Sequence, residues 1–191
     1  MCLIVDANLA ALIFSVPPTD DFRPLIEWLT LPNKDGKLVV GGHLAVELDK
    51  VTAARRFIRS LHQAGRARII PNDATEEETN RVKAICVSND PHVIALARVS
   101  GARIVCSRDT TLHQDFTNQE LISAPRGHIY QNAEHEHLLL SDPMAVRRPH
   151  GLRRYPGCAV QCFLAPLCAR AGIVAADATR QRISSGTEKY A

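Results

Sequence analysis

Three carboxylates stand where the sequence predicts a helix to begin or a strand to end, namely Asp6, Asp90 and Asp109, and a fourth, Glu47, lies about one turn into a predicted helix. Carboxylates that gather at one place repel one another, and divalent cations are the usual means of neutralising them. Oxygen ligands of this kind suit Mg²⁺ or Mn²⁺. One or two such ions can activate a water and stabilise the leaving oxygen of a phosphodiester. The acids therefore predict metal-dependent hydrolysis, provided that the fold brings them to one place.

The stretch from residue 88 to residue 116 positions two of these acids. Asp90 and Pro91 are typical of a helix start, and Gly101 is suited to end that helix in a left-handed conformation. The run 103–106 predicts a buried strand, and Asp109 follows it. In an open α/β sheet, helix N-termini and strand C-termini lie at one edge, so both carboxylates can face one site. The alternative is that Asp90 only caps its helix and Asp109 only forms a turn.

The rest of the body alternates between short apolar runs and helical patterns. Asp6 ends a first predicted strand at 3–5, which should place it at the same edge as Asp109, although it could also be a simple helix cap. Glu47 lies about one turn into a predicted helix, and Asp49 points to another face of that helix. Helices are predicted near 9–14, 20–30, 43–50, 51–64, 75–86 and 132–140, and further strands at 38–40, 68–70 and either 121–122 or 128–130.

This alternation predicts one α/β domain over residues 1–146. We expect a central, mainly parallel sheet of four or five strands with helices on both faces. A chain of 191 residues that is 46% hydrophobic can bury one sizeable core.

The composition bounds the class of protein. No run of eighteen apolar residues occurs, so we expect no membrane span. The first residues lack a basic region and reach Asp6 early, which argues against a signal peptide. Six irregularly spaced cysteines then indicate reduced thiols and a cytoplasmic protein.

Charge is divided unevenly along the chain. Residues 147–191 hold eight Lys/Arg and two Asp/Glu, a net +6, whereas residues 1–146 hold fifteen and eighteen, a net −3. The sequence predicts a basic, poorly ordered extension at 147–191, which either contributes affinity for RNA or has no role. Arg55, Arg56 and Arg59 should form a basic patch that contacts phosphates, or else an ordinary solvated helix face.

Three segments carry a resemblance to the PIN domain family of metal-dependent nucleases, a family that includes the toxins of toxin–antitoxin pairs. They are LIVDAN at the start, GGHLAVEL around Glu47, and NDPHVIALARVSGARIVCSRDTTLHQDF. The resemblance covers roughly residues 1–130 and implies a PIN-like three-layer α/β/α sandwich. The extension from Arg147 has no counterpart in the family pattern.

The same resemblance implies roles for particular residues. Asp6, Glu47, Asp90 and Asp109 match the catalytic acidic cluster, and Asn8 matches the polar position beside the first acid, where it would contact substrate. Mg²⁺ or Mn²⁺ would be held by Asp6, Asp90, Asp109 and the more variable Asp115. The implied activity is cleavage of single-stranded or structured RNA. The implied partner is a small antitoxin protein. A second copy of the chain is a separate expectation.

Other readings are weaker. The chain has no glycine-rich phosphate loop and no G-x-S-x-G nucleophile motif. A rival from another class is a catalytically silent PIN-fold protein that binds RNA or protein through its basic extension. The presence of all four acids favours the enzyme.

Overall fold

The structure is a computed structural model that describes residues 1–140, so the predicted extension at 147–191 lies outside the described residues. Its strands are β1 (Cys2–Val5), β2 (Lys37–Gly41), β3 (Ala67–Ile70), β4 (Ile104–Cys106) and β5 (His128–Tyr130). Its α-helices are α1 (Ala10–Ile13), α2 (Arg23–Thr30), α3 (Gly42–Lys50), α4 (Thr52–Gln63), α5 (Asn72–Val82), α6 (Pro91–Ser100) and α7 (Thr110–Thr117). Short 3₁₀ helices are η1 (Ala7–Leu9), η2 (Asp20–Phe22) and η3 (Ala133–Leu139).

The five strands form one sheet in the order β3-β2-β1-β4-β5, and every neighbouring pair is parallel. The predicted α/β class and the parallel sheet are confirmed. Of the two candidates for the last strand, the sheet uses 128–130, and Leu121 and Ile122 are buried in the core instead.

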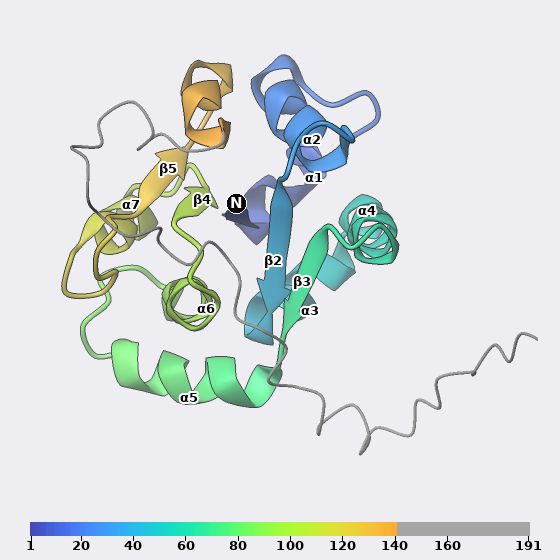
Figure 1. The fold of residues 1–191 in the computed structure, drawn as a ribbon. Helices are drawn as coiled ribbons and strands as arrows, with labels where there is room; N and C mark the ends of the chain where they lie inside the picture. The colour runs from blue at the N-terminus through green and yellow to red at the C-terminus, as the bar shows by residue number, and fades with distance from the viewer. Residues whose placement is uncertain (141–191) are drawn as a thin grey trace, which may run out of the picture. The chain divides into compact units, whose positions relative to one another are not determined.

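Helices cover both faces of the sheet, which gives three layers. Figure 1 shows α2 and α4 on one side of β2 and β3, with α5 and α6 on the other side. The middle layer is apolar because β1 is buried along its whole length, as is β4. This is the pattern expected of parallel strands that are covered on both faces.

The helix before β4 forms as its sequence predicts. Pro91 stands in its first turn, and Gly101 ends it in the left-handed conformation at φ 75°. Its apolar side chains are buried on nearly every side, because α6 packs against both α5 and the sheet. Both ends of α5 were predicted too late in the sequence. The helix spans Asn72–Val82 rather than 75–86, and it begins directly after Pro71.

The cysteines give a mixed result. Cys86 and Cys106 are free thiols as expected, but Cys2 is disulfide-bonded, so the prediction of reduced thiols throughout is wrong at Cys2. Among residues 1–140, no helix is long and apolar enough to cross a membrane.

Candidate active site

The site lies where the direction of strand addition reverses. From β1 the chain adds β2 and β3 on one side, and then returns to add β4 and β5 on the other side. The crevice at the carboxyl ends of strands beside such a reversal is where open α/β sheets bind ligands. Asp6 directly follows β1, and Asp109 follows the adjacent β4 by three positions. The Asp6 amide continues the pairing, donating to the Cys106 carbonyl at 3.0 Å.

Asp6 is held rigidly at this edge. The residue is only 4% exposed. Oδ1 accepts a hydrogen bond from the Asn8 amide at 3.0 Å, and Oδ2 accepts one from Ser107 Oγ at 2.8 Å. Ser107 Oγ in turn accepts a 3.0 Å hydrogen bond from the Asp109 amide. One buried hydroxyl therefore connects the residues that follow β1 and β4.

Asp109 is the N-cap of α7. Its Oδ1 accepts hydrogen bonds from the amide of Thr111 at 2.7 Å, from the hydroxyl of the same residue at 2.7 Å and from the Leu112 amide at 3.3 Å. The Thr111 hydroxyl, followed by the two amides, lowers the pKa of Asp109 below its ordinary value. Oδ2 has no hydrogen-bond partner among the described residues. Asp109 thus stays ionised and keeps an oxygen available for a ligand.

Asp90 differs from the other acids because it stands at a helix N-cap without capping the helix. Its side chain makes no cap hydrogen bond to α6. Burial raises the pKa of Asp90; His92 opposes that shift, and the negative charges of Asp6, Glu47 and Asp109 add to it. Three carboxylates from other parts of the chain therefore lie within electrostatic reach of Asp90, and the interpretation of Asp90 as only a cap does not hold.

Glu47 is clamped between two histidines that the sequence analysis did not single out. Its Oε1 lies 3.4 Å from Nε2 of His43, and its Oε2 lies 3.2 Å from Nε2 of His92. The contact with His43 follows from i,i+4 spacing within α3 and could have been predicted from HLAVE. The contact with His92 depends on how α6 packs against α3, which no local pattern reveals.

Asp115 is buried and supports the segment that leads to Asp90. Its Oδ1 accepts from the Val87 amide at 3.0 Å, and its Oδ2 accepts from the Ser88 amide at 2.8 Å. Each carboxylate oxygen is thus occupied by a backbone donor two or three positions before Asp90.

The predicted substrate-binding residues lie on the surface. Asn8 is exposed, and its backbone amide contributes to the Asp6 cap. Arg55, Arg56 and Arg59 are exposed on α4, as their helical spacing predicted. Arg55 approaches Asp49 at 3.8 Å, and Arg55 and Arg59 line a shallow pocket of 280 Å³.

The chemistry of the donor set fits a divalent cation that binds oxygen ligands. Among the described residues, no three His, Cys, Asp or Glu side chains are grouped closely enough to form a ready-made metal site. Such a group is not required for Mg²⁺, which usually keeps several waters and is held by one or two carboxylates. The uncommitted carboxyl of Asp90 and Oδ2 of Asp109 are suitable ligands, next to the charge of Asp6.

Comparisons against models of protein families, against curated proteins and against solved structures found no match to this chain. The chemistry of this site is therefore inferred from its own residues and from the topology that assembles them.

Proposed function

We propose that residues 1–140 form a PIN-like nuclease domain that hydrolyses RNA phosphodiester bonds with Mg²⁺ or Mn²⁺. The observation that carries the proposal is the environment of Asp90. Its carboxyl is left out of helix capping and lies in the field of three other acids, where the sheet order reverses. An arrangement that costs stability and serves no packing role is typical of a functional site.

The acids divide into metal ligands and supporting residues in this proposal. Asp6, Asp90 and Asp109 hold the cation directly or through water. Asp6 is fixed by its two hydrogen bonds, and the lowered pKa of Asp109 keeps that carboxylate charged. Asp115 positions Asp90 through the backbone of residues 87 and 88.

Glu47 orients the attacking water in this proposal. The two histidines hold its carboxylate in one direction, and a carboxylate oxygen can accept a hydrogen bond from that water. A bound divalent cation supplies the remaining chemistry, because it lowers the pKa of water and stabilises the leaving oxygen. The chain itself contributes position and negative charge.

The substrate and partners follow from the same proposal. The exposed arginines of α4 contact the RNA backbone, which offsets the repulsion between phosphates and the acidic site. Inhibition by a small antitoxin protein remains a prediction of the family resemblance. A cytoplasmic location, expected from the cysteines, and self-association also remain predictions.

The direct test is cleavage of labelled RNA by the purified full chain. We expect cleavage of single-stranded or structured RNA with Mn²⁺ and none in EDTA. Equal cleavage with and without EDTA would remove the cation from the mechanism.

A further inference from the structure

A pocket of 310 Å³ adjoins the acidic site, between α3, α5 and α6. His92 connects the two, because it lines the pocket, bonds Glu47 and lies two positions after Asp90. The volume is within the range of about 300–1,000 Å³ that is usual for small-molecule sites. A group bound here would therefore lie next to a phosphodiester held by the acids.

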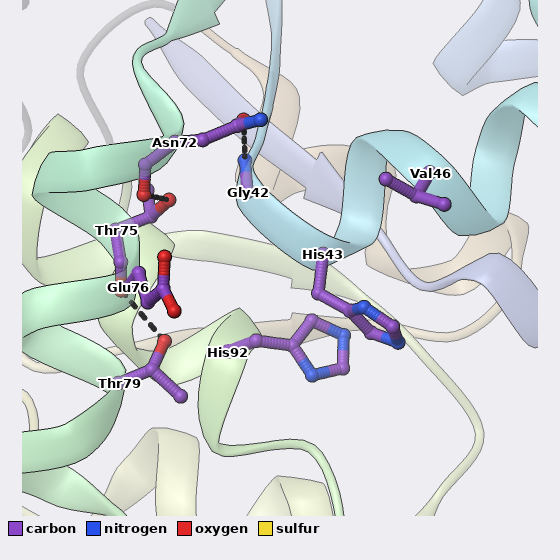
Figure 2. A pocket seen from close by; sticks show the side chains of 8 residues that line it. All are labelled: Gly42, His43, Val46, Asn72, Thr75, Glu76, Thr79 and His92. Carbon is purple, nitrogen blue, oxygen red and sulfur yellow. Dashed lines mark hydrogen bonds between the residues drawn. The ribbon is translucent and has the colours of Figure 1, made fainter.

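One wall of the pocket is formed by two imidazole rings. His43 and His92 meet edge to face, with 5.1 Å between ring centroids and an interplanar angle of 83°. Figure 2 shows both rings on the side opposite α5, with Val46 further along α3. Aromatic and imidazole rings of this kind are what proteins use to stack an unpaired RNA base.

The facing wall, on α5, offers hydrogen-bonding groups one helical turn apart. Asn72 Oδ1 accepts a 3.1 Å hydrogen bond from the Gly42 amide, which orients the side chain and leaves its Nδ2 as a donor. Glu76 lines the same wall, and its carboxylate has no hydrogen-bond or ion-pair partner among the described residues. Asn72 thus supplies a donor at the Gly42 end of the pocket, and Glu76, one turn further along α5, supplies two adjacent acceptors.

This combination matches one nucleobase. Guanine carries two neighbouring donors, N1–H and N2–H, and beside them the acceptor O6. A carboxylate can accept from both donors while an amide donates to O6. Adenine, cytosine and uracil lack two neighbouring donors on that edge. No lysine or arginine is among the described residues that line the pocket, which disfavours a phosphate as its occupant.

We propose that this pocket binds a guanine base of the RNA substrate, with Glu76 and Asn72 bonding to its edge and one of the two histidine rings stacking on its face. The inference rests on the proposed nuclease function and specifies the substrate: cleavage takes place next to a guanine. Glu76 is a specificity residue here and has no part in the chemistry.

The test is equilibrium binding of fluorescein-labelled RNA pentamers to the full chain in EDTA. We expect UUGUU to bind at least about fivefold more tightly than UUAUU, since a bidentate contact discriminates bases by about that factor or more. UUIUU, in which inosine lacks the N2 donor, should bind with intermediate affinity. Equal affinity for UUGUU and UUAUU, or no binding of either, would overturn the proposal.

A matched pair of variants assigns the preference to the pocket. Glu76→Gln should remove the guanine preference, because its amide replaces one acceptor with a donor. Glu77→Gln makes the same charge change one position away, at a side chain that is paired with Arg81 and does not line the pocket, and should keep the preference. A preference that persists in Glu76→Gln would overturn the assignment. Thermal unfolding of both variants checks that each is folded.

Two further measurements separate this inference from the proposed function. Guanosine monophosphate as a competitor should bind more weakly than UUGUU; equal binding would overturn the assignment to RNA. Cleavage with Mn²⁺ but without guanine preference would overturn the assignment of guanine to the pocket, while the proposed nuclease function would stand. A guanine preference that depends on Glu76, without any cleavage, would support the assignment of guanine to the pocket and overturn the proposed nuclease function.

Discussion

Ser107 Oγ donates a 2.8 Å hydrogen bond to Asp6 Oδ2, joining residues that are 101 positions apart in sequence. The same oxygen accepts from the Asp109 amide at 3.0 Å, and Ser107 is fully buried, so water cannot replace either partner. This hydroxyl therefore fixes Asp6 relative to Asp109, at the edge where β1 and β4 end.

Replacing Ser107 with alanine should lower the free energy of unfolding by about 1–3 kcal/mol, because a buried carboxylate and a partly buried amide each lose a partner. Urea unfolding measures the change. The control is Ser60→Ala, which removes an exposed hydroxyl bonded within α4 and should change stability by less than about 0.5 kcal/mol. Equal stability of Ser107→Ala and the unmodified protein would show that this hydrogen bond does not hold the site.

Asp115 should act on structure rather than on metal. Asp115→Asn replaces one acceptor oxygen with a donor, so one of the two amides at residues 87 and 88 is left unpaired, at a cost of about 1–3 kcal/mol. Mn²⁺ should still raise its melting temperature by mass action, because the remaining hydrogen bond keeps the segment before Asp90 in place. In Asp109→Asn the same shift should shrink. A comparable loss of the shift in both variants would make Asp115 a metal ligand.

The raised pKa of Asp90 predicts that its charge destabilises the fold in the absence of metal. Folding raises the pKa of this carboxyl above its ordinary value of 3.8. Its contribution to stability is therefore fully present below pH 3.8 and is lost as the pH rises through the raised pKa. In EDTA at neutral pH, Asp90→Asn should therefore melt above the unmodified protein. The difference should fade as the pH drops below 3.8. A variant that melts lower at neutral pH would show that the carboxylate stabilises the fold.

Local patterns were sufficient to predict most of the fold. The helix start at Pro91, the left-handed Gly101 and the strand at 103–106 all depend on residues adjacent in sequence, and each formed as expected. The acids Asp6 and Asp109 were placed correctly at one edge because parallel topology fixes where strand ends meet.

Tertiary contacts were beyond local patterns. The bond between His92 and Glu47 joins α6 to α3. The hydrogen bonds from the amides of residues 87 and 88 to Asp115 join a loop to α7. Neither contact joins residues at a regular helical or strand spacing, so no local pattern predicts it. The pocket beside α5 depends on the same packing, since its walls come from three helices.

The basic face of α4 should contribute to RNA binding through charge alone. Arg56→Gln combined with Arg59→Gln should weaken binding of single-stranded RNA about equally for all sequences. The slope of log affinity against log salt should become shallower by about 1.4, since each phosphate contact contributes about 0.7. The control is Arg23→Gln, which removes an exposed arginine at the start of α2 that is paired with Asp20. This variant should keep the slope. An unchanged slope in the double variant would leave the patch as an ordinary solvated face.

The proposed nuclease is tested most directly by single-turnover cleavage of labelled RNA with Mn²⁺, comparing the unmodified chain with Asp90→Asn and Asp49→Asn. Asp90 caps nothing, so its replacement leaves the helix intact, and Asp49 is an exposed acid on α3 outside the candidate site. We expect Asp90→Asn to slow cleavage by about 100-fold or more, because even outer-shell partners of metal ligands cost about 10- to 100-fold. With saturating protein, Asp49→Asn should cleave at the unmodified rate, because its pairing with Arg55 bears on RNA binding and not on the chemistry. Full cleavage by a folded Asp90→Asn, or no cleavage by the unmodified chain, would contradict the account.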